Sequence, residues 1–198
     1  VSNRVSPPAA DFPRLNSPAR WSAPRRKMTP MAETWIRLLG PPKIESPGTT
    51  PPQPKGRKAW AVLAYLALQP DGISRGRTAT LLFPDAADPL GALRWNLSEL
   101  RRTLDGVSIT GDPLRLTLLP PWHCDAVELV GSANGHGLDP RTVDGQLLEG
   151  LSFADNAVFD SWLADQRYRL ENCVQSLLYE ASLAALAAGA AADAVDLA

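Results

Sequence analysis

The clearest alternation of apolar and polar positions in this chain lies in residues 89–104. Leucines recur there at steps of three and four residues, at positions 90, 93, 97, 100 and 104. At about 100° per residue, this spacing places the leucines along one stripe of a helix. The other face would present Gly91, Trp95, Ser98, Glu99 and Arg102, with Arg94 and Arg101 at the edge of the stripe. The segment therefore predicts a helix that is anchored by leucine and carries arginines on its free side.

Shorter patterns precede this helix. Residues 35–40 alternate loosely and residues 43–45 follow a Pro-Pro turn, which predicts a short antiparallel pair of strands. Residues 57–69 are apolar nearly all round, which is typical of a buried helix. Ser74 is a favourable N-cap for a second helix, which we expect to end at residues 83–84.

A hairpin is predicted after residue 104. Residues 107–110 and 114–118 alternate in polarity and flank a Gly-Asp-Pro turn. The order along the chain is then two strands, a buried helix, a helix, a turn, a helix and a hairpin. This order predicts a winged helix-turn-helix, in which the third helix suits the major groove of DNA. The competing interpretation of residues 89–104 is an ordinary solvated surface helix.

The end of the chain shows a second helical pattern. Apolar residues at positions 159, 162, 163, 170, 174, 177, 178 and 181 would give one long helix a continuous packing stripe. We expect Gly189 to end this helix and the alanine-rich residues 190–198 to begin the next one. Nine residues make a marginal helix and a helical repeat needs a neighbour, so we expect the chain to stop within a helical domain.

Charge is distributed unevenly along the 198 residues, although the net charge is only −1. Residues 1–107 carry sixteen basic and eight acidic side chains, whereas residues 108–198 carry four and thirteen. A basic first part favours a polyanionic partner, and an acidic second part would be repelled by one. The alternative is a chance segregation of charge between two domains.

The first thirty residues are rich in Pro, Ser, Ala and Arg and show no apolar periodicity, so we expect them to be disordered. The basic cluster at residues 25–27 would add non-specific DNA affinity if it served as an arm. We favour a segment that does not take part in DNA binding. The candidate translation starts are Val1, Met28 and Met31.

The elements above resemble the DNA-binding domain of the Streptomyces antibiotic regulatory protein family, which is built on an OmpR-type winged helix. The matching segments are residues 36–40, 56–67, 73–75, 81–85 and 92–104. Residues 145–151 and 159–167 resemble the bacterial transcriptional activator domain of the same family. The resemblance implies that this second domain is a tetratricopeptide-like stack of helices.

The expected fold is mainly α with small antiparallel β. We predict three regions: a disordered segment at 1–33, a winged helix-turn-helix domain at 34–120, and a helical activator domain at 121–198 that is incomplete at its C-terminus. The sequence departs from the family pattern in the second helix at residues 76–78, at Phe83, and in a short wing at 111–116 without the family's Tyr. The short wing puts a minor-groove contact in doubt. Arg115 is the one wing residue that we keep as a candidate DNA contact.

The candidate DNA-binding residues are of two kinds. Arg94, Trp95, Ser98 and Arg102 are expected to face bases or the groove wall, because Arg can bond guanine in a bidentate manner. Arg75, Arg77 and Arg101 are expected to contact phosphates and position the domain. Glu99 is expected to pair with Arg102 instead of contacting a base. Trp95 has a competing role as a packed aromatic side chain.

No catalytic, cofactor-binding or metal-binding motif is found. His123, Cys124 and Asp125 are adjacent, and neighbours in sequence point different ways on a regular element. His136 lies in a Gly-rich loop without a partner in motif spacing. Two distant cysteines, Cys124 and Cys173, suggest reduced thiols and a cytoplasmic protein, and no apolar run approaches the length of a membrane span.

These observations predict a sequence-specific, double-stranded DNA-binding transcription regulator and not an enzyme. The resemblance implies that it is an activator, that RNA polymerase is a partner, and that its C-terminal helices bind a partner or form a homodimer. The alternative is a protein-interaction module of a larger regulator whose winged helix has lost its DNA affinity.

Overall fold

The computed structural model describes residues 33–132, 143 and 145–197. The predicted segment at 1–33, its basic cluster and its two methionines, and the loop around His136 lie outside the described residues, except for Glu33. The elements are β1 (Thr34–Arg37), β2 (Lys43–Glu45), α1 (Arg57–Ala67), α2 (Arg75–Leu82), α3 (Pro89–Thr103), β3 (Val107–Thr110), β4 (Arg115–Leu118), β5 (Trp122–Cys124), α4 (Asp125–Ser132), α5 (Ala157–Ala187) and α6 (Ala191–Leu197).

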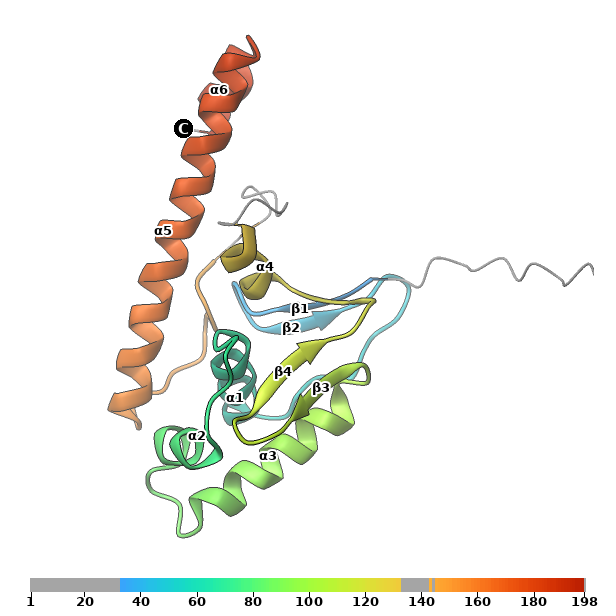
Figure 1. The fold of residues 1–198 in the computed structure, drawn as a ribbon, viewed down its shortest axis with the longest axis vertical. Coiled ribbons are helices and arrows are strands. Elements are labelled where there is room, and N and C mark those ends of the chain that lie inside the picture. Colours follow the sequence, from blue (N-terminus) through green and yellow to red (C-terminus); the bar gives the residue numbers. More distant parts are fainter. Residues whose placement is uncertain (1–32, 133–142, 144, 198) are drawn as a thin grey trace, which may run out of the picture. The chain divides into compact units, whose positions relative to one another are not determined.

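The predicted strands, helices and hairpin are confirmed, and the structure adds one strand and one helix. β1 pairs antiparallel with β2, and β3 pairs antiparallel with β4. β5 pairs parallel with β1, so that β1 is the central strand of a three-stranded sheet (Figure 1). This parallel pairing crosses residue 120, which the sequence analysis placed as a domain boundary. That boundary stays a prediction.

α1 forms the centre of the helix-turn-helix unit. Eight consecutive side chains, Ala59 to Leu66, are buried, as expected of a helix that other elements cover on every side. α2 and α3 pack against it, and the β3–β4 hairpin follows α3 (Figure 1). The predicted N-cap is confirmed, because the Ser74 side chain accepts a hydrogen bond from the backbone N–H of Arg77 at 3.2 Å.

The leucine stripe of α3 is confirmed at four of its five positions. Leu93, Leu97, Leu100 and Leu104 are at most 1% exposed, whereas Leu90 is 45% exposed. Leu90 lies in the first turn, where the helix extends past the side chains that cover the rest of the stripe. Glu99 was expected on the free face and is instead buried, with its carboxylate pairing with Arg102.

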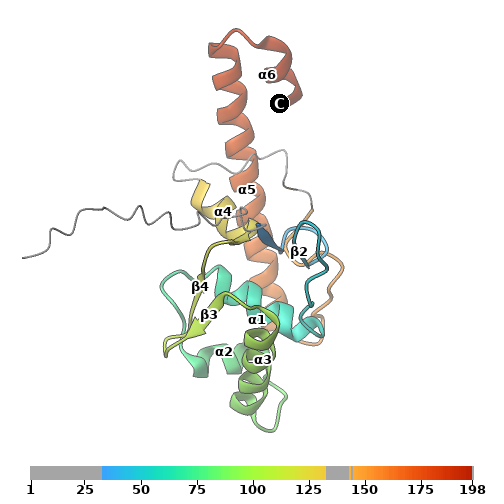
Figure 2. The same ribbon diagram turned by 90° about the vertical axis from the view of Figure 1, so that its right-hand side faces the viewer.

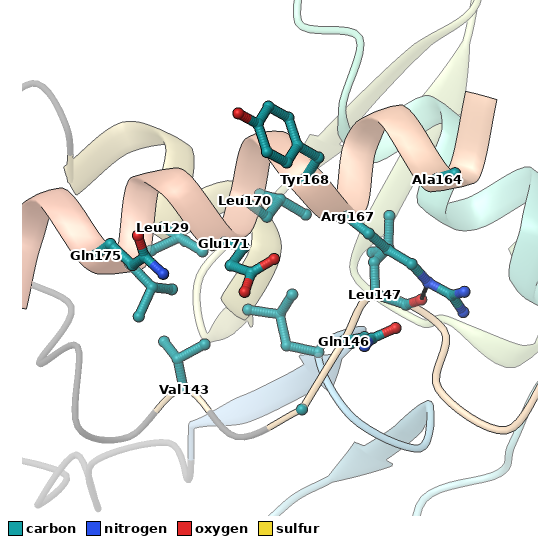
Figure 3. Close-up of a pocket in the computed structure, with 13 residues that line it drawn as sticks. Leu129, Val143, Gln146, Leu147, Ala164, Arg167, Tyr168, Leu170, Glu171 and Gln175 are labelled. Atoms are coloured by element: carbon teal, nitrogen blue, oxygen red, sulfur yellow. Dashed lines mark hydrogen bonds between the residues drawn. The ribbon is translucent and has the colours of Figure 1, made fainter. Parts of the chain in front are cut away.

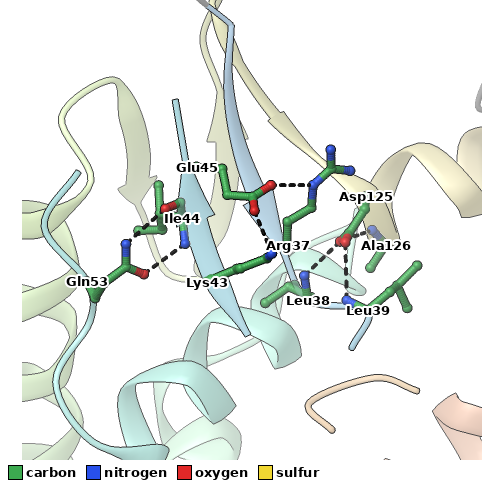
Figure 4. A network of polar contacts seen from close by, with 9 residues as sticks. All are labelled: Arg37, Leu38, Leu39, Lys43, Ile44, Glu45, Gln53, Asp125 and Ala126. Carbon is green, nitrogen blue, oxygen red and sulfur yellow. Dashed lines mark hydrogen bonds and ion pairs between the residues drawn. The ribbon is translucent and has the colours of Figure 1, made fainter. Parts of the chain in front are cut away.

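Asp125 links the residues that follow β1 to those that follow β5, at one end of the three-stranded sheet, as Figure 4 shows. Its carboxylate accepts hydrogen bonds from the backbone N–H groups of Leu38 at 2.8 Å, Leu39 at 3.2 Å and Ala126 at 2.7 Å. Burial raises the pKa of Asp125 above its ordinary value, although the three N–H donors favour the ionised form. The carboxylate thereby fixes the end of β1 to the start of α4.

We expect Asp125→Asn to lower the free energy of unfolding by about 1–3 kcal/mol, because a buried donor would lose its partner. One of the two carboxylate oxygens accepts from Leu39 alone, and an amide nitrogen placed there would face that N–H. Urea unfolding at pH 7 measures the change. Asp71→Asn, at an exposed position, serves as the control. Equal midpoints for the two variants would contradict the role given to Asp125.

The two cysteines differ in accessibility. Cys124 is buried in β5, and burial raises the pKa of its thiol to about 12, with the charge of Asp125 acting in the same direction. Cys173 on α5 is partly exposed. Because the thiolate is the reactive form, Cys124 should be inert in the folded protein.

A thiol-labelling experiment with dithiobis(nitrobenzoate) at pH 8 should therefore release about one equivalent of chromophore quickly from the native chain. The second equivalent should follow only after denaturation. Cys173→Ser should abolish the fast phase. Two thiols that react at the same rate in the native chain would show that β5 opens readily.

α5 begins at an N-cap, Asn156, whose side chain accepts a hydrogen bond from the backbone N–H of Phe159 at 3.1 Å. Its first half is anchored by Phe159, Leu163 and Leu170, all buried. The predicted stripe continues after residue 170 only as partly exposed side chains, at Val174, Leu177 and Leu178. The predicted end of this helix near Gly189 and the next helix after it are confirmed (Figure 2).

Candidate nucleic-acid interface

α3 is set by a strong N-terminal cap. Asp88 is the N-cap and accepts a hydrogen bond from the backbone N–H of Gly91 at 2.8 Å, and Pro89 occupies the first helical position. Both features are favourable at a helix start. With its leucines packed inward, α3 lies at the edge of the helix-turn-helix unit, beside the β3–β4 hairpin (Figures 1 and 2). Its outer face is therefore accessible.

Four of the predicted contacts share this outer face. Arg94, Trp95, Ser98 and Arg102 are all exposed, and the Trp95 side chain is 62% exposed. The competing role of Trp95 as a packed side chain therefore does not hold in this structure. The Ser98 hydroxyl donates to the carbonyl of Arg94 at 2.9 Å. The face thus presents two guanidinium groups about two helical turns apart, together with an exposed indole ring.

The two guanidinium groups are held differently. Arg94 pairs with Asp88 at 3.2 Å, and both side chains are about two-thirds exposed. Such a pair contributes little and opens readily. Arg102 pairs with Glu99 at 2.5 Å, and Glu99 is only 8% exposed on its side chain. The expected pairing of Glu99 with Arg102 is confirmed, and it orients the second guanidinium group.

Arg101 connects α3 to the hairpin. Its Nε and one terminal nitrogen donate to the carbonyl of Ile109 in β3, at 3.0 and 2.6 Å. The guanidinium group has five N–H donors, so part of it is still available for a phosphate. The predicted phosphate contact stays a prediction. The structure adds a positioning role, which fixes the hairpin relative to α3.

Arg75 and Arg115 lie together at the tip of the hairpin. The backbone N–H of Arg75 donates to Asp112 at 3.1 Å, and its Nε donates to the carbonyl of Gly111 at 3.1 Å. Arg115 is exposed on β4 and lies against Gly72, whose φ of 81° is a conformation that favours glycine. A Cβ at position 72 would lie 2.8 Å from the Arg115 side chain. Arg75 thus bonds to the hairpin turn, and Arg115 packs on the segment that leads into α2.

Arg77 is not placed with the other candidates. It is exposed on α2 and lines a groove together with Leu81 of the same helix and with Val158 and Trp162 of α5. Sequence reasoning placed Arg75 and Arg77 in one turn and treated them alike. It also missed Asp88, which pairs with the Arg94 guanidinium group, and Asp112, which accepts from the backbone N–H of Arg75. An Asp directly before Pro89 was the one signal in the sequence for such a cap.

A separate pocket of about 560 Å³ lies between α5, α4 and the segment 145–147 (Figure 3). Its walls are mainly apolar and include Leu129, Leu147 and Leu170. Arg167 donates from Nε to the carbonyl of Leu147 at 2.9 Å, which ties this segment to α5. Among the described residues, its lining includes no Ser, Thr, Cys or His side chain.

The predicted absence of a metal site was argued from the residues around His123. There, His123 contacts Glu128 at 2.6 Å and stacks on Trp35 with 4.9 Å between ring centroids. No group of three or more potential metal ligands occurs within residues 33–132, 143 and 145–197. In the same residues, no helix is long and apolar enough to cross a membrane.

No family model matches the chain, and no curated protein matches it in sequence. Among solved structures, it is similar to Mycobacterium tuberculosis EmbR in complex with a low-affinity phosphopeptide, with a TM-score of 0.55 and 18% identity. The match covers 84% of this chain and 48% of the EmbR chain, so this chain spans about half the length of that protein. At this identity the likeness shows the fold alone, and it confirms a mainly helical fold with small sheets, which are antiparallel except for the parallel β1–β5 pair.

Proposed function

We propose that this protein is a transcription regulator of the Streptomyces antibiotic regulatory protein type, which binds double-stranded DNA sequence-specifically with α3 in the major groove. The observation that carries the proposal is the exposed face of α3, where the described part of the chain leaves Arg94, Trp95, Ser98 and Arg102 accessible. A helix of this kind beside a hairpin is the arrangement that winged helices use to enter the groove.

The role of each side chain follows from its chemistry. Arg94 and Arg102 are proposed to bond guanine O6 and N7, and Ser98 and Trp95 to contact base edges or the groove wall. Arg75, Arg101 and Arg115 are proposed to contact phosphates on either side, because they lie at the ends of α2, α3 and the hairpin. Gene activation and contact with RNA polymerase are further parts of the proposal, supported by the resemblance of residues 145–151 and 159–167 to an activator domain.

Selection of genomic DNA fragments by the purified chain tests this proposal. A recurring sequence motif among the bound fragments is the expected result. The affinity for a selected fragment should fall with salt, with a log–log slope of about −0.9 per phosphate contacted. Equal binding of all fragments, or no enrichment, would refute sequence-specific binding.

The alternative function, a protein-interaction module that does not bind DNA, is favoured by a different observation. Leu183 and Leu186 on α5 and Val195 on α6 are 47%, 55% and 75% exposed. Exposed apolar side chains gathered on one helical pair are typical of a protein contact. A homodimer through these helices is the form of this contact that we propose, and sedimentation of the chain at several concentrations tests it.

A further inference from the structure

A groove separates α2 from the first turns of α5, on the part of α2 that carries Arg77. It has a volume of about 650 Å³, and its lining includes Tyr65, Arg77, Leu81, Pro84, Val158 and Trp162. We call it the α2–α5 groove. Neither the proposed DNA contacts of α3 nor the exposed apolar side chains of α6 lie in it.

The floor of the α2–α5 groove is held in place by packing and hydrogen bonds. Trp162 packs edge-on against Tyr65, with 4.9 Å between ring centroids, and stacks on Phe159 at 5.2 Å. The Asn156 amide donates to the carbonyl of Leu81 at 2.7 Å, which joins the start of α5 to α2. The groove is therefore preformed, so binding would not require ordering of these side chains.

The exposed rim of the groove combines one cation with apolar surface. Val158 is 68% exposed, and Pro84 is also exposed. Arg77 is exposed and makes no ion pair with any other described residue. No carboxylate lines the groove. The rim therefore complements a ligand that has a negative charge next to an apolar group.

Helix geometry separates Arg77 from the DNA-facing candidates. Two residues along a helix differ by about 200° in direction, so Arg75 and Arg77 leave α2 on nearly opposite sides. Arg75 bonds to the hairpin turn at Gly111, whereas Arg77 lines the groove against α5. The hairpin side and the groove side of α2 thus serve different surfaces.

We propose that the α2–α5 groove binds a segment of another protein in which an acidic side chain adjoins a bulky apolar one. Arg77 pairs with the carboxylate, and the apolar side chain packs against Trp162, Val158 and Leu81. Arg77 is then a partner contact and not a phosphate contact. This binding is independent of the DNA function, because none of the groove residues lies on α3.

The test is a selection of 12-residue peptides from a random display library on the full 198-residue chain, followed by affinity measurements on the wild type and on Val158→Asp. Val158 is exposed, so an Asp there should block the groove and leave the fold intact. Enriched peptides should contain Asp or Glu next to Leu, Phe or Trp. Their affinity, measured by fluorescence polarisation of the labelled peptide, should fall at least tenfold in Val158→Asp and in Arg77→Glu.

Two controls define the outcome. Val195→Asp, an equally exposed position on α6, should bind the peptides as the wild type does. Replacing the acid of the peptide by its amide should weaken binding at least tenfold. Peptides without an acid, equal binding to Val158→Asp, or no enrichment would overturn the proposal. Arg77→Ala should also leave the affinity for any bound DNA unchanged, and a loss as large as that of Arg75→Ala would return Arg77 to the DNA surface.

Discussion

Replacing Arg94 and Arg102 together by Ala should abolish selective DNA binding while the protein stays folded. A bidentate arginine–guanine contact contributes about 1–3 kcal/mol of discrimination, so losing two should reduce selectivity for the preferred fragment by roughly 30-fold to 20,000-fold. Both side chains are exposed and only pair with carboxylates of their own helix region. Their removal leaves the leucine stripe in place, so the fold should be kept, although the free energy of unfolding should fall because the buried Glu99 carboxylate loses its partner.

The measurement is a titration of the selected DNA fragment and of an unrelated fragment with the double variant. Lys43→Ala/Arg169→Ala removes the same charge from β2 and α5, two elements other than α3, and is the matched control. The control should lose some affinity for both fragments alike and keep the difference between them. A double variant that keeps its preference for the selected fragment would refute base contacts from α3.

Phe159→Ala should lower the free energy of unfolding by about 3–5 kcal/mol. The Phe159 side chain is fully buried and lies between Phe153, at 4.8 Å between ring centroids, and Trp162, at 5.2 Å. Truncation leaves a cavity between these rings, where rigid aromatic neighbours cannot close in easily. The loss should concentrate on the first turns of α5, because these rings are what attach it to the helix-turn-helix unit.

Urea unfolding measures the overall loss, and hydrogen exchange of the α5 amides locates it. Val158→Ala, one residue earlier and 68% exposed, should change stability by less than about 0.5 kcal/mol. If Phe159→Ala unfolds at the same urea concentration as this control, α5 is not anchored at Phe159.

Periodic segments of the chain were predictable because one face of each packs against a continuous core. The buried helix at 57–69, the Ser74 cap and the hairpin after residue 106 each follow from a local pattern that the tertiary structure agrees with. The α3 stripe was predictable for the same reason. The exception in this stripe is Leu90, which fits the leucine spacing but is not covered by other side chains.

Features that depend on distant segments were not predictable. β5 has three residues, too few for an alternating pattern, and it exists because β1 lies beside it some ninety residues away in the sequence. The role of Asp125 depends on the same contact, since its partners include the N–H groups of Leu38 and Leu39. A local pattern holds no information about either pairing.

The sequence was sufficient to predict which residues belong to the candidate site. It was less informative about which of these residues lie on the same surface. The exposed face of α3 could be derived from the leucine spacing, because the residues outside the leucine stripe must lie on the other side of the helix. Helix geometry places Arg75 and Arg77 on opposite sides of α2, but the groove that Arg77 lines could not be predicted, because it depends on α5 packing against α2. Burial of Glu99 likewise required the surroundings of α3 to be known.

The single continuous helix α5 sets both the distance and the angle around its axis between the Phe159 anchor and α6. Its 31 residues include the buried Phe159 anchor near the start and α6 at the far end. At 1.5 Å per residue, the anchor and α6 are about 40 Å apart along the helix, roughly the length of a dozen base pairs of DNA. One inserted residue in the exposed second half would turn α6 by about 100° around this axis. A partner bound at α6 is therefore positioned by the number of residues in α5, as well as by its own contacts.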